Sequence, residues 1–303
     1  MATRSPVSGA SKGIRGDGAT HPAPTNGGGR ELALFEEGET RLDKLSRDAF
    51  LRSRGIDPTK PLQLEIWPQD MRAIPNDYAR SAIFTVRNKK EPRVSLQSTL
   101  IFHVDKSVKV TFTGLELRAD DDELVWQQII DYAKHYTLGS AVEFNLHQLC
   151  KDLGWSINSR NYDRVRECIT RLKANEIKVE NERLGKGVGL SLIREYEFDD
   201  HGSRYRVWIH PNLIMLFAGK TYTQVEWRNY RDLKPIARRL YDYLASHRQP
   251  YPLLLETFHK MCGSTCGRTK KWAEMVREAC AEIVDAGLVK KAWVNDARIF
   301  CER

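Results

Sequence analysis

Apolar residues recur at helical spacing in two separate stretches of this 303-residue chain. In residues 161–177, Val165, Ile169 and Leu172 share one face when each residue advances about 100° around a helix. In residues 268–286 the same spacing brings together Trp272, Val276, Cys280 and Ile283. Each stretch is therefore predicted to be a helix with one buried face and one polar face.

The later helix belongs to an ordered series of elements. The pattern predicts a helix at 235–247, an extended link at 251–253, a helix at 254–261, a turn at 262–265, the long helix at 268–286, and two strands at 289–293 and 298–301. A helix, a strand, two helices joined by a turn and a two-stranded wing together make a winged helix.

The earlier stretch repeats that order. The pattern predicts a helix at 120–136, a strand at 142–144, a helix at 146–153, a turn at 154–156, the helix at 161–177, and a hairpin of 188–198 with 205–209. We therefore predict an α+β fold with two tandem winged-helix domains, residues 76–210 and 211–303. Residues 211–217 and 222–230 are too apolar for a free linker, so we expect the domains to pack together.

The residues before these domains have a different composition. Residues 1–70 are predicted to be a long, largely disordered extension, since its first thirty residues carry almost no aliphatic side chains and are rich in Gly and Ser. Within it, a helix at 40–54 would have Leu42, Leu45 and Ala49 on its apolar side. From residue 76 we expect a short helix at 77–82, a strand at 83–86, and a hairpin of 100–104 with 108–113.

The charge of the chain favours a polyanionic partner, because the formal net charge is +8. The second helix of a helix-turn-helix meets bases and phosphates, and arginine is suited to both. Arg160, Arg164 and Arg171 are predicted to lie roughly opposite the buried face of the helix at 161–177. With a basic loop, the predicted DNA-binding residues are Arg87, Lys89, Lys90, Asn158, Ser159, Arg160, Arg164, Arg171, Thr265, Arg268, Lys270 and Lys271.

The sequence gives little support for metal binding or catalysis. The acidic residues 120–122 are best explained by the positive end of a helix dipole rather than by a metal. His259, Cys262 and Cys266 lack the paired spacing of a zinc site, so we interpret them as packing and turn residues. We find no nucleophile motif or catalytic carboxylate pair, and we expect neither enzyme activity nor a cofactor.

The expected location is the cytoplasm. The six cysteines fit a reduced compartment, and the N-terminus lacks a signal-peptide pattern. No apolar run approaches the roughly 18 residues that a membrane-spanning helix needs. We therefore expect no membrane partner.

Several blocks of the sequence resemble the TrfA family of plasmid replication initiators. They are residues 76–82, 87–90, 113–114, 116–121, 152–155, 237–239, 246–248, 250–253, 256–258, 261–264, 270–272 and 292–296. The resemblance covers roughly residues 67–303. It implies tandem winged helices that bind repeated sites (iterons) at a plasmid origin and help to open an adjacent AT-rich region. It further implies recruitment of the host replicative helicase with the host initiator, single-stranded origin DNA as a further ligand, and exchange between dimers and monomers.

The resemblance also implies a short motif of the Gln-Leu-Ser-Leu-Phe type that binds the sliding clamp. Leu32, Leu34 and Phe35 keep the Leu-x-Leu-Phe part and lie where no neighbour can bury them. The alternative motif is Gln63, Leu64 and Trp67, which keeps the Gln but ends in Trp. We favour the first motif.

Two other functions remain open. A winged-helix transcriptional repressor without a replication role would use the same DNA-binding elements. An adaptor for the clamp or helicase would touch DNA only nonspecifically. Repressors more often dimerise to double their DNA-binding helices, so the doubled winged helix favours an initiator.

Overall fold

The computed structural model describes residues 41–181, 186–199, 202–218 and 221–303. Contacts divide the chain into two units, Met1–Lys44 and Leu45–Arg303. Only residues 41–44 of the first unit are described. The predicted disorder of residues 1–40 and the motif at 31–35 therefore lie outside the described residues.

The first described element is the helix α1 (Arg41–Ser53), which confirms the helix predicted at 40–54. The prediction of its apolar face is wrong, because Leu45 is 55% exposed and Ala49 is also exposed. Leu51 is instead fully buried, and Phe50 packs against the core. The packing of the helix is thus set by distant parts of the chain rather than by its own periodicity.

The predicted disorder also extends too far, since residues 45–70 contribute to the core of the second unit. Leu64 and Trp67 are each 2% exposed, and the Trp67 ring stacks on Phe217 with centroids 6.2 Å apart. The next residues form β1 (Met71–Pro75), which pairs antiparallel with β11 (Tyr222–Glu226). This pairing joins residues far apart in sequence, which is why local patterns did not predict it.

A four-stranded sheet follows, with the strand order β3-β4-β7-β8. Its strands are β3 (Ser95–Ile101), β4 (Val108–Leu115), β7 (Glu176–Asn181) and β8 (Lys186–Leu190). The antiparallel pair β3–β4 confirms the predicted hairpin. Nearby lie α2 (Asn76–Ala79) and the parallel pair of β2 (Phe84–Thr85) with β5 (Leu117–Arg118).

Six elements form what we call the first module. They are α3 (Asp122–Ala133), β6 (Ala141–Asn145), α4 (Leu146–Asp152), α5 (Ser159–Lys173), β9 (Glu195–Phe198) and β10 (Arg204–Trp208). Their sheet has the order β6-β10-β9, so the first strand pairs with the last. The buried residues of α5 include all three that periodicity predicted.

Two predictions in this region are wrong. The helix predicted at 161–177 ends at Lys173, because the Asn175 side chain donates to the carbonyls of Arg171 and Leu172 and the chain then enters β7. The strand predicted at 188–198 is two strands, β8 and β9, which belong to different sheets. Ile193, buried at the corner between them, donates its N–H to the Leu172 carbonyl.

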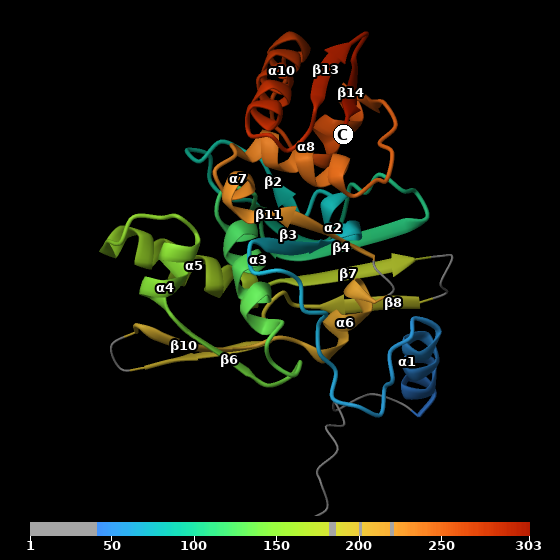
Figure 1. Ribbon diagram of the computed structural model, residues 1–303, viewed down its shortest axis with the longest axis vertical. Helices are drawn as coiled ribbons and strands as arrows, with labels where there is room; N and C mark the ends of the chain where they lie inside the picture. The colour runs from blue at the N-terminus through green and yellow to red at the C-terminus, as the bar shows by residue number, and fades with distance from the viewer. Residues whose placement is uncertain (1–40, 182–185, 200–201, 219–220) are drawn as a thin grey trace, which may run out of the picture. The chain divides into compact units, whose positions relative to one another are not determined.

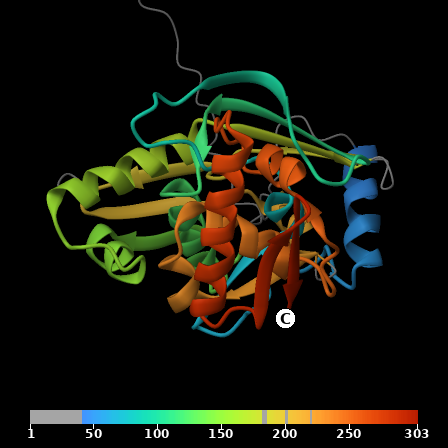
Figure 2. The ribbon, with the colours of Figure 1, turned by 90° about the horizontal axis from the view of Figure 1, so that it is seen from above.

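The second module repeats the order of the first. It consists of α8 (Pro235–Ala245), β12 (Leu253–Leu254), α9 (Leu255–Met261), α10 (Thr269–Asp285), β13 (Lys291–Asn295) and β14 (Arg298–Glu302). The sheet order is β12-β14-β13, again with the first strand against the last. Figure 1 shows α10 and the β13–β14 hairpin above α8, and Figure 2 shows α10 beside that hairpin.

The modules are connected by a structured segment. It contains the 3-10 helix η2 (Pro211–Leu213), α6 (Ile214–Phe217), β11 and α7 (Trp227–Arg231). Trp227 and Arg231 of α7 both donate to the Asp152 carbonyl at the end of α4. The connector is therefore packed on the first module, and both modules lie in one compact unit. The exact boundary at 210/211 stays a prediction.

Candidate nucleic-acid interface

The start of α10 carries an exposed basic surface on a firmly anchored helix. Trp272 is 2% exposed and donates its indole N–H to the Leu255 carbonyl at 3.0 Å. The neighbouring Arg268, Lys270 and Lys271 are all exposed. Lys271 has one acidic neighbour, Glu274, with Nζ and Oε2 3.4 Å apart. Basic side chains in the first turn of a buried helix can therefore reach a partner without rearrangement of the core.

A groove of about 520 Å³ lies between α10 and the hairpin β13–β14. Lys270 and Arg277 line one side, and Asn295 and Asp296 at the hairpin tip line the other. The tip turns through Asp296 and Ala297, whose φ angles are 44° and 60°. The Ala297 carbonyl accepts the Leu255 N–H at 2.9 Å, which fixes the hairpin tip against the start of α9.

The start of α5 is capped by its own residues. The Asn158 side chain accepts the Asn161 N–H at 2.9 Å, the arrangement of an N-cap. The Asn161 side chain donates to the Ser156 carbonyl at 2.8 Å. Ser159 and Arg160 are exposed. Asn158 therefore has a structural role at this helix end, and Ser159 and Arg160 are its accessible polar side chains.

Arg164 and Arg171, two further arginines of α5, are not on the outward face where the sequence placed them. Arg164 donates to the Asp120 carboxylate at 2.6 Å, and its guanidinium lies 4.1 Å from the centre of the Trp155 ring. Arg171 is only 11% exposed and bonds Asp122 at 2.9 Å. Both flank the start of α3, which packs against α5. The outward orientation predicted for Arg171 is wrong, because its charge is paired with aspartates inside the protein.

The acidic residues at the start of α3 bind arginines. Arg93 contacts Asp121 at 2.9 Å and Asp122 at 2.6 Å, and Arg171 contacts both. Burial opposes ionisation of Asp121, but Arg93 and the other guanidinium groups outweigh it and lower its pKa. Burial and the adjacent Asp121 raise the pKa of Asp122 to about 6. These aspartates therefore pair with arginines in the protein, in addition to the interaction with the helix dipole that the sequence suggested.

Potential metal ligands are present in two places. Ligand atoms of Asp121, Asp122 and Cys168 lie within 4.8 Å of one another, but the guanidinium groups occupy both carboxylates and burial raises the pKa of the Cys168 thiol. His259 bonds the Cys266 carbonyl at 3.0 Å, and Cys262 is fully buried. Neither group is arranged as an open cation site.

The loop between β2 and β3 connects the two modules. Val86 donates its N–H to the Cys262 carbonyl at 2.9 Å, and Arg87 donates to the Gly263 carbonyl at 3.4 Å. The Thr265 hydroxyl lies 3.3 Å from the Glu91 carboxylate in this loop. The turn before α10 is thus held by the loop that carries the predicted basic residues.

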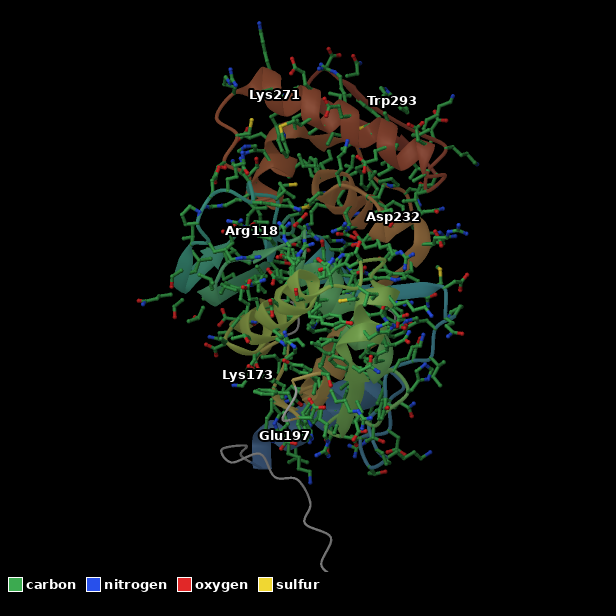
Figure 3. The ribbon with its side chains drawn as sticks, turned by 90° about the vertical axis from the view of Figure 1, so that its left-hand side faces the viewer. Arg118, Lys173, Glu197, Asp232, Lys271 and Trp293 are labelled. Carbon is green, nitrogen blue, oxygen red and sulfur yellow. The ribbon has the colours of Figure 1, made fainter. Side chains whose placement is uncertain are left out.

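The basic residues of this loop differ in exposure. Arg87 is 29% exposed and 3.3 Å from Glu116, whereas Lys89 is 69% exposed and 2.8 Å from Asp120. Lys90 is exposed. Arg118 fixes the loop by donating to the Asn88 and Glu91 carbonyls. Figure 3 shows Arg118 between Lys271 of α10 and Lys173 of α5.

Of the two short apolar motifs, only the alternative can be placed. Leu64 and Trp67 are buried, Trp67 donates to Asp131 at 2.8 Å, and Gln63 donates to the Lys134 carbonyl at 3.0 Å. This segment is part of the core and cannot dock in a partner without unfolding. The favoured motif, Leu32, Leu34 and Phe35, lies outside the described residues.

The sequence analysis missed a row of aromatic side chains across the three-stranded sheet β6-β10-β9. Tyr205 of β10 pairs with Phe144 of β6 and with Phe198 of β9. Its ring centre lies 6.1 Å from that of Phe144 and 5.8 Å from that of Phe198, which is 61% exposed. Alternating aromatic residues are visible in the sequence, but their alignment depends on a register that the sequence alone does not give.

The comparisons with known proteins agree with this description. A family model described as TrfA protein matches residues 59–303. The plasmid replication initiator protein TrfA of Escherichia coli is 52% identical over 266 residues, which are 85% of this chain and 70% of that protein. The class is that of plasmid replication initiators. The chain belongs to the TrfA family.

Two solved structures of domains 2 and 3 of RctB are also similar to this chain. Their TM-scores are 0.49 and 0.44, each at 11% sequence identity. They cover 69% and 66% of this chain and 85% and 81% of their own. Separately, among the described residues no helix is long and apolar enough to cross a membrane.

Proposed function

We propose that this protein initiates plasmid replication by binding iterons in duplex origin DNA through two winged helices, the first and second modules. The observation that carries the proposal is the exposed basic start of α10, set beside a wing in a module whose topology occurs twice. In this proposal α5 and α10 are the recognition helices, which enter successive major grooves. The family membership supports the replication role.

The charges differ between the two recognition helices. Arg164 and Arg171 of α5 are paired with aspartates, whereas Arg268 and Lys270 of α10 are exposed at its start. A cation that is already neutralised releases fewer counterions from DNA. The second module is therefore expected to supply most of the salt-dependent affinity, and Arg160 most of the contribution from α5.

Footprinting on the cognate plasmid tests this function. Protection of tandem direct repeats is the expected result, since one monomer carries two recognition helices. Protection of a single palindrome would instead favour the transcriptional repressor. Uniform weak protection would favour an adaptor that contacts DNA nonspecifically. We propose no catalytic step for the protein.

Single-stranded origin DNA is a second candidate ligand. The row of Phe144, Tyr205 and Phe198 supports it, because Phe198 at the end of the row is 61% exposed and offers a ring on which an unpaired base can stack. Arg204 and Arg206 lie in the same strand and line the adjoining hollow, where Arg206 is paired with Glu143 and Glu197. Phe198→Ala is expected to weaken binding of a single-stranded origin oligonucleotide while binding to duplex iterons is kept. Equal loss on both ligands would contradict this role.

Host proteins complete the proposal. We propose that Leu32, Leu34 and Phe35 bind the sliding clamp, which is supported by the burial of the alternative motif at Leu64 and Trp67. Recruitment of the host helicase and host initiator, and exchange between dimers and monomers, are proposed from the family membership alone.

A further inference from the structure

Asp120 joins two cations of the candidate DNA interface that come from different elements. Its Oδ2 atom lies 2.6 Å from Arg164 Nη2 and 2.8 Å from Lys89 Nζ. Lys89 belongs to the β2–β3 loop and Arg164 to α5. Asp120 is 19% exposed, so its carboxylate lies at the surface where both cations meet solvent.

The two aspartates that follow are paired differently. Asp121 and Asp122 bind Arg93 and Arg171, which are 15% and 11% exposed, so these charges cancel inside the protein. Asp121 also lies 3.8 Å from Arg164 Nε, which is farther than the 2.6 Å between Arg164 and Asp120. Asp120 is the outer member of the acidic group. Lys89 and Arg164 carry two positive charges and Asp120 one negative charge, so this part of the interface is only half as positive as its basic residues suggest.

Asp120 is also held in place. It directly precedes Asp121, the N-cap of α3, and its carbonyl accepts a second bond from Arg164 Nη2 at 3.1 Å. A DNA phosphate that approached Lys89 or Arg164 would therefore meet a carboxylate that cannot move away. The phosphate and the carboxylate are both negative, and two like charges a few ångströms apart repel strongly near a protein surface.

Asp120 is not needed to orient Arg164. The guanidinium already stacks on the Trp155 ring, 4.1 Å from its centre, and bonds the Asp120 backbone carbonyl. Both contacts survive when the carboxylate is replaced by an amide. The main effect of the carboxylate on Arg164 and Lys89 is thus neutralisation.

We propose that Asp120 weakens the contact of the first module with the phosphate backbone. It lowers binding to any duplex by a similar factor, whatever its sequence. Phosphate contacts carry no direct sequence information, so Asp120 sets the strength and the salt dependence of DNA binding and leaves the sequence preference unchanged. This inference rests on the proposed duplex binding.

The test compares Asp120→Asn with a matched control, Asp163→Asn. Asp163 lies on α5 itself, is 64% exposed and pairs with Arg166 at 2.7 Å, so both substitutions remove one negative charge from this surface. Binding of the full chain is measured by fluorescence anisotropy over a salt series. The probes are a duplex with the origin repeats and a scrambled duplex of equal length.

Asp120→Asn is expected to tighten binding to the scrambled duplex about threefold to tenfold and to steepen the plot of log K against log salt by about 0.9. Binding to the repeat duplex should tighten by a similar factor, because both duplexes share the phosphate contacts that the substitution strengthens. The same result for Asp163→Asn would overturn the inference, and so would weaker binding of Asp120→Asn to both duplexes. A wild-type protein that binds the two duplexes equally would contradict the proposed function instead.

A second comparison does not depend on the folding of Asp120→Asn. Lys89 is neutralised by Asp120, whereas within the described residues no acidic partner is found for the exposed side chain of its neighbour Lys90. Lys90→Ala is expected to lower the salt slope by about 0.9, and Lys89→Ala by clearly less. Equal losses for the two lysines would overturn the proposal.

Discussion

Arg239 of α8 donates a hydrogen bond to Glu123 of α3 with both side chains fully buried. Arg239 Nη1 lies 2.9 Å from Glu123 Oε1 and 2.8 Å from Asp242 Oδ2, and none of the three side chains is exposed to solvent. Arg239 also donates to the carbonyls of Tyr78, Ala79 and Ser81. The helices that open the two modules are thus joined through a polar network that is completely shielded from water.

The first prediction concerns pH. Burial, and then the charge of Asp242, raise the pKa of Glu123 to about 8. The folded protein therefore holds a proton on Glu123 that the unfolded chain has lost above its ordinary pKa. The free energy of unfolding should fall as pH rises toward about 8, and Glu123→Gln should flatten this slope. Urea denaturation across this pH range measures it, with exposed Glu278→Gln as the control. An unchanged slope in Glu123→Gln would contradict the assignment.

Removal of the cation should have a much larger effect. Arg239→Met leaves Asp242 buried without its guanidinium partner and also leaves three carbonyls without a donor. The expected loss of stability is about 3–5 kcal/mol. Arg194→Met, at an exposed position, is the control. A loss below about 1 kcal/mol would mean that the network does little to hold the modules together.

Gly263 offers a test of the contact between the second module and the β2–β3 region. Its φ is +54°, and a Cβ atom there would lie 2.8 Å from Thr85 Cγ2. Thr85 cannot rotate freely because its hydroxyl bonds Glu116. Gly263→Ala should cost about 1–3 kcal/mol through the left-handed backbone alone, and more through the clash. Gly267→Ala has open space around it and should change thermal stability little.

Substitutions of exposed cations should weaken DNA binding, whereas substitution of a cation paired inside the protein should lower stability. Lys271→Ala and Arg164→Ala should weaken binding to the iteron duplex and lower its salt slope. The decrease should be at most about 0.9 for Lys271, whose pair with Glu274 is solvent-exposed, and smaller for Arg164, which Asp120 holds at 2.6 Å. Arg171→Ala should instead lower thermal stability, because it breaks buried pairs with Asp121 and Asp122. Lys234→Ala, at the start of α8, is the charge-matched control. No change in any variant would remove these helices as the DNA-binding elements.

Clamp binding distinguishes the two short motifs. Replacing Leu34 and Phe35 together by Ala should abolish capture by the sliding clamp and leave iteron binding and thermal stability unchanged. Trp67→Ala should lower stability by about 3–5 kcal/mol, because Trp67 is buried and donates to Asp131. Capture that survives the double substitution would contradict the assignment to Leu34 and Phe35.

Local patterns predicted the parts of the fold that depend on local interactions. The buried faces of α5 and α10 and the β3–β4 hairpin follow from periodicity, and all were confirmed. The pairing of β1 with β11 and the division of 188–198 between two sheets depend on distant partners, and both were missed. The apolar side of α1 was wrong for the same reason.

The candidate site divides in the same way. The exposure of Arg160, Lys270 and Lys271 agrees with helix geometry. The pairing of Arg171 could not be predicted from the sequence of α5 alone, because the aspartates that neutralise Arg171 come from the start of α3. A helical wheel assigns a side to each residue but cannot tell which neighbouring element covers that side.

The strand pair β1–β11 has a consequence for the DNA that the protein can accept. The connector between the modules is itself hydrogen-bonded to Met71–Pro75, so lengthening it would break backbone bonds rather than add slack. The separation of α5 and α10 is then fixed by the fold. In the proposed binding mode, a plasmid could not insert half a helical turn within each iteron without losing one of the two contacts, so this strand pair would constrain the phase of its repeats.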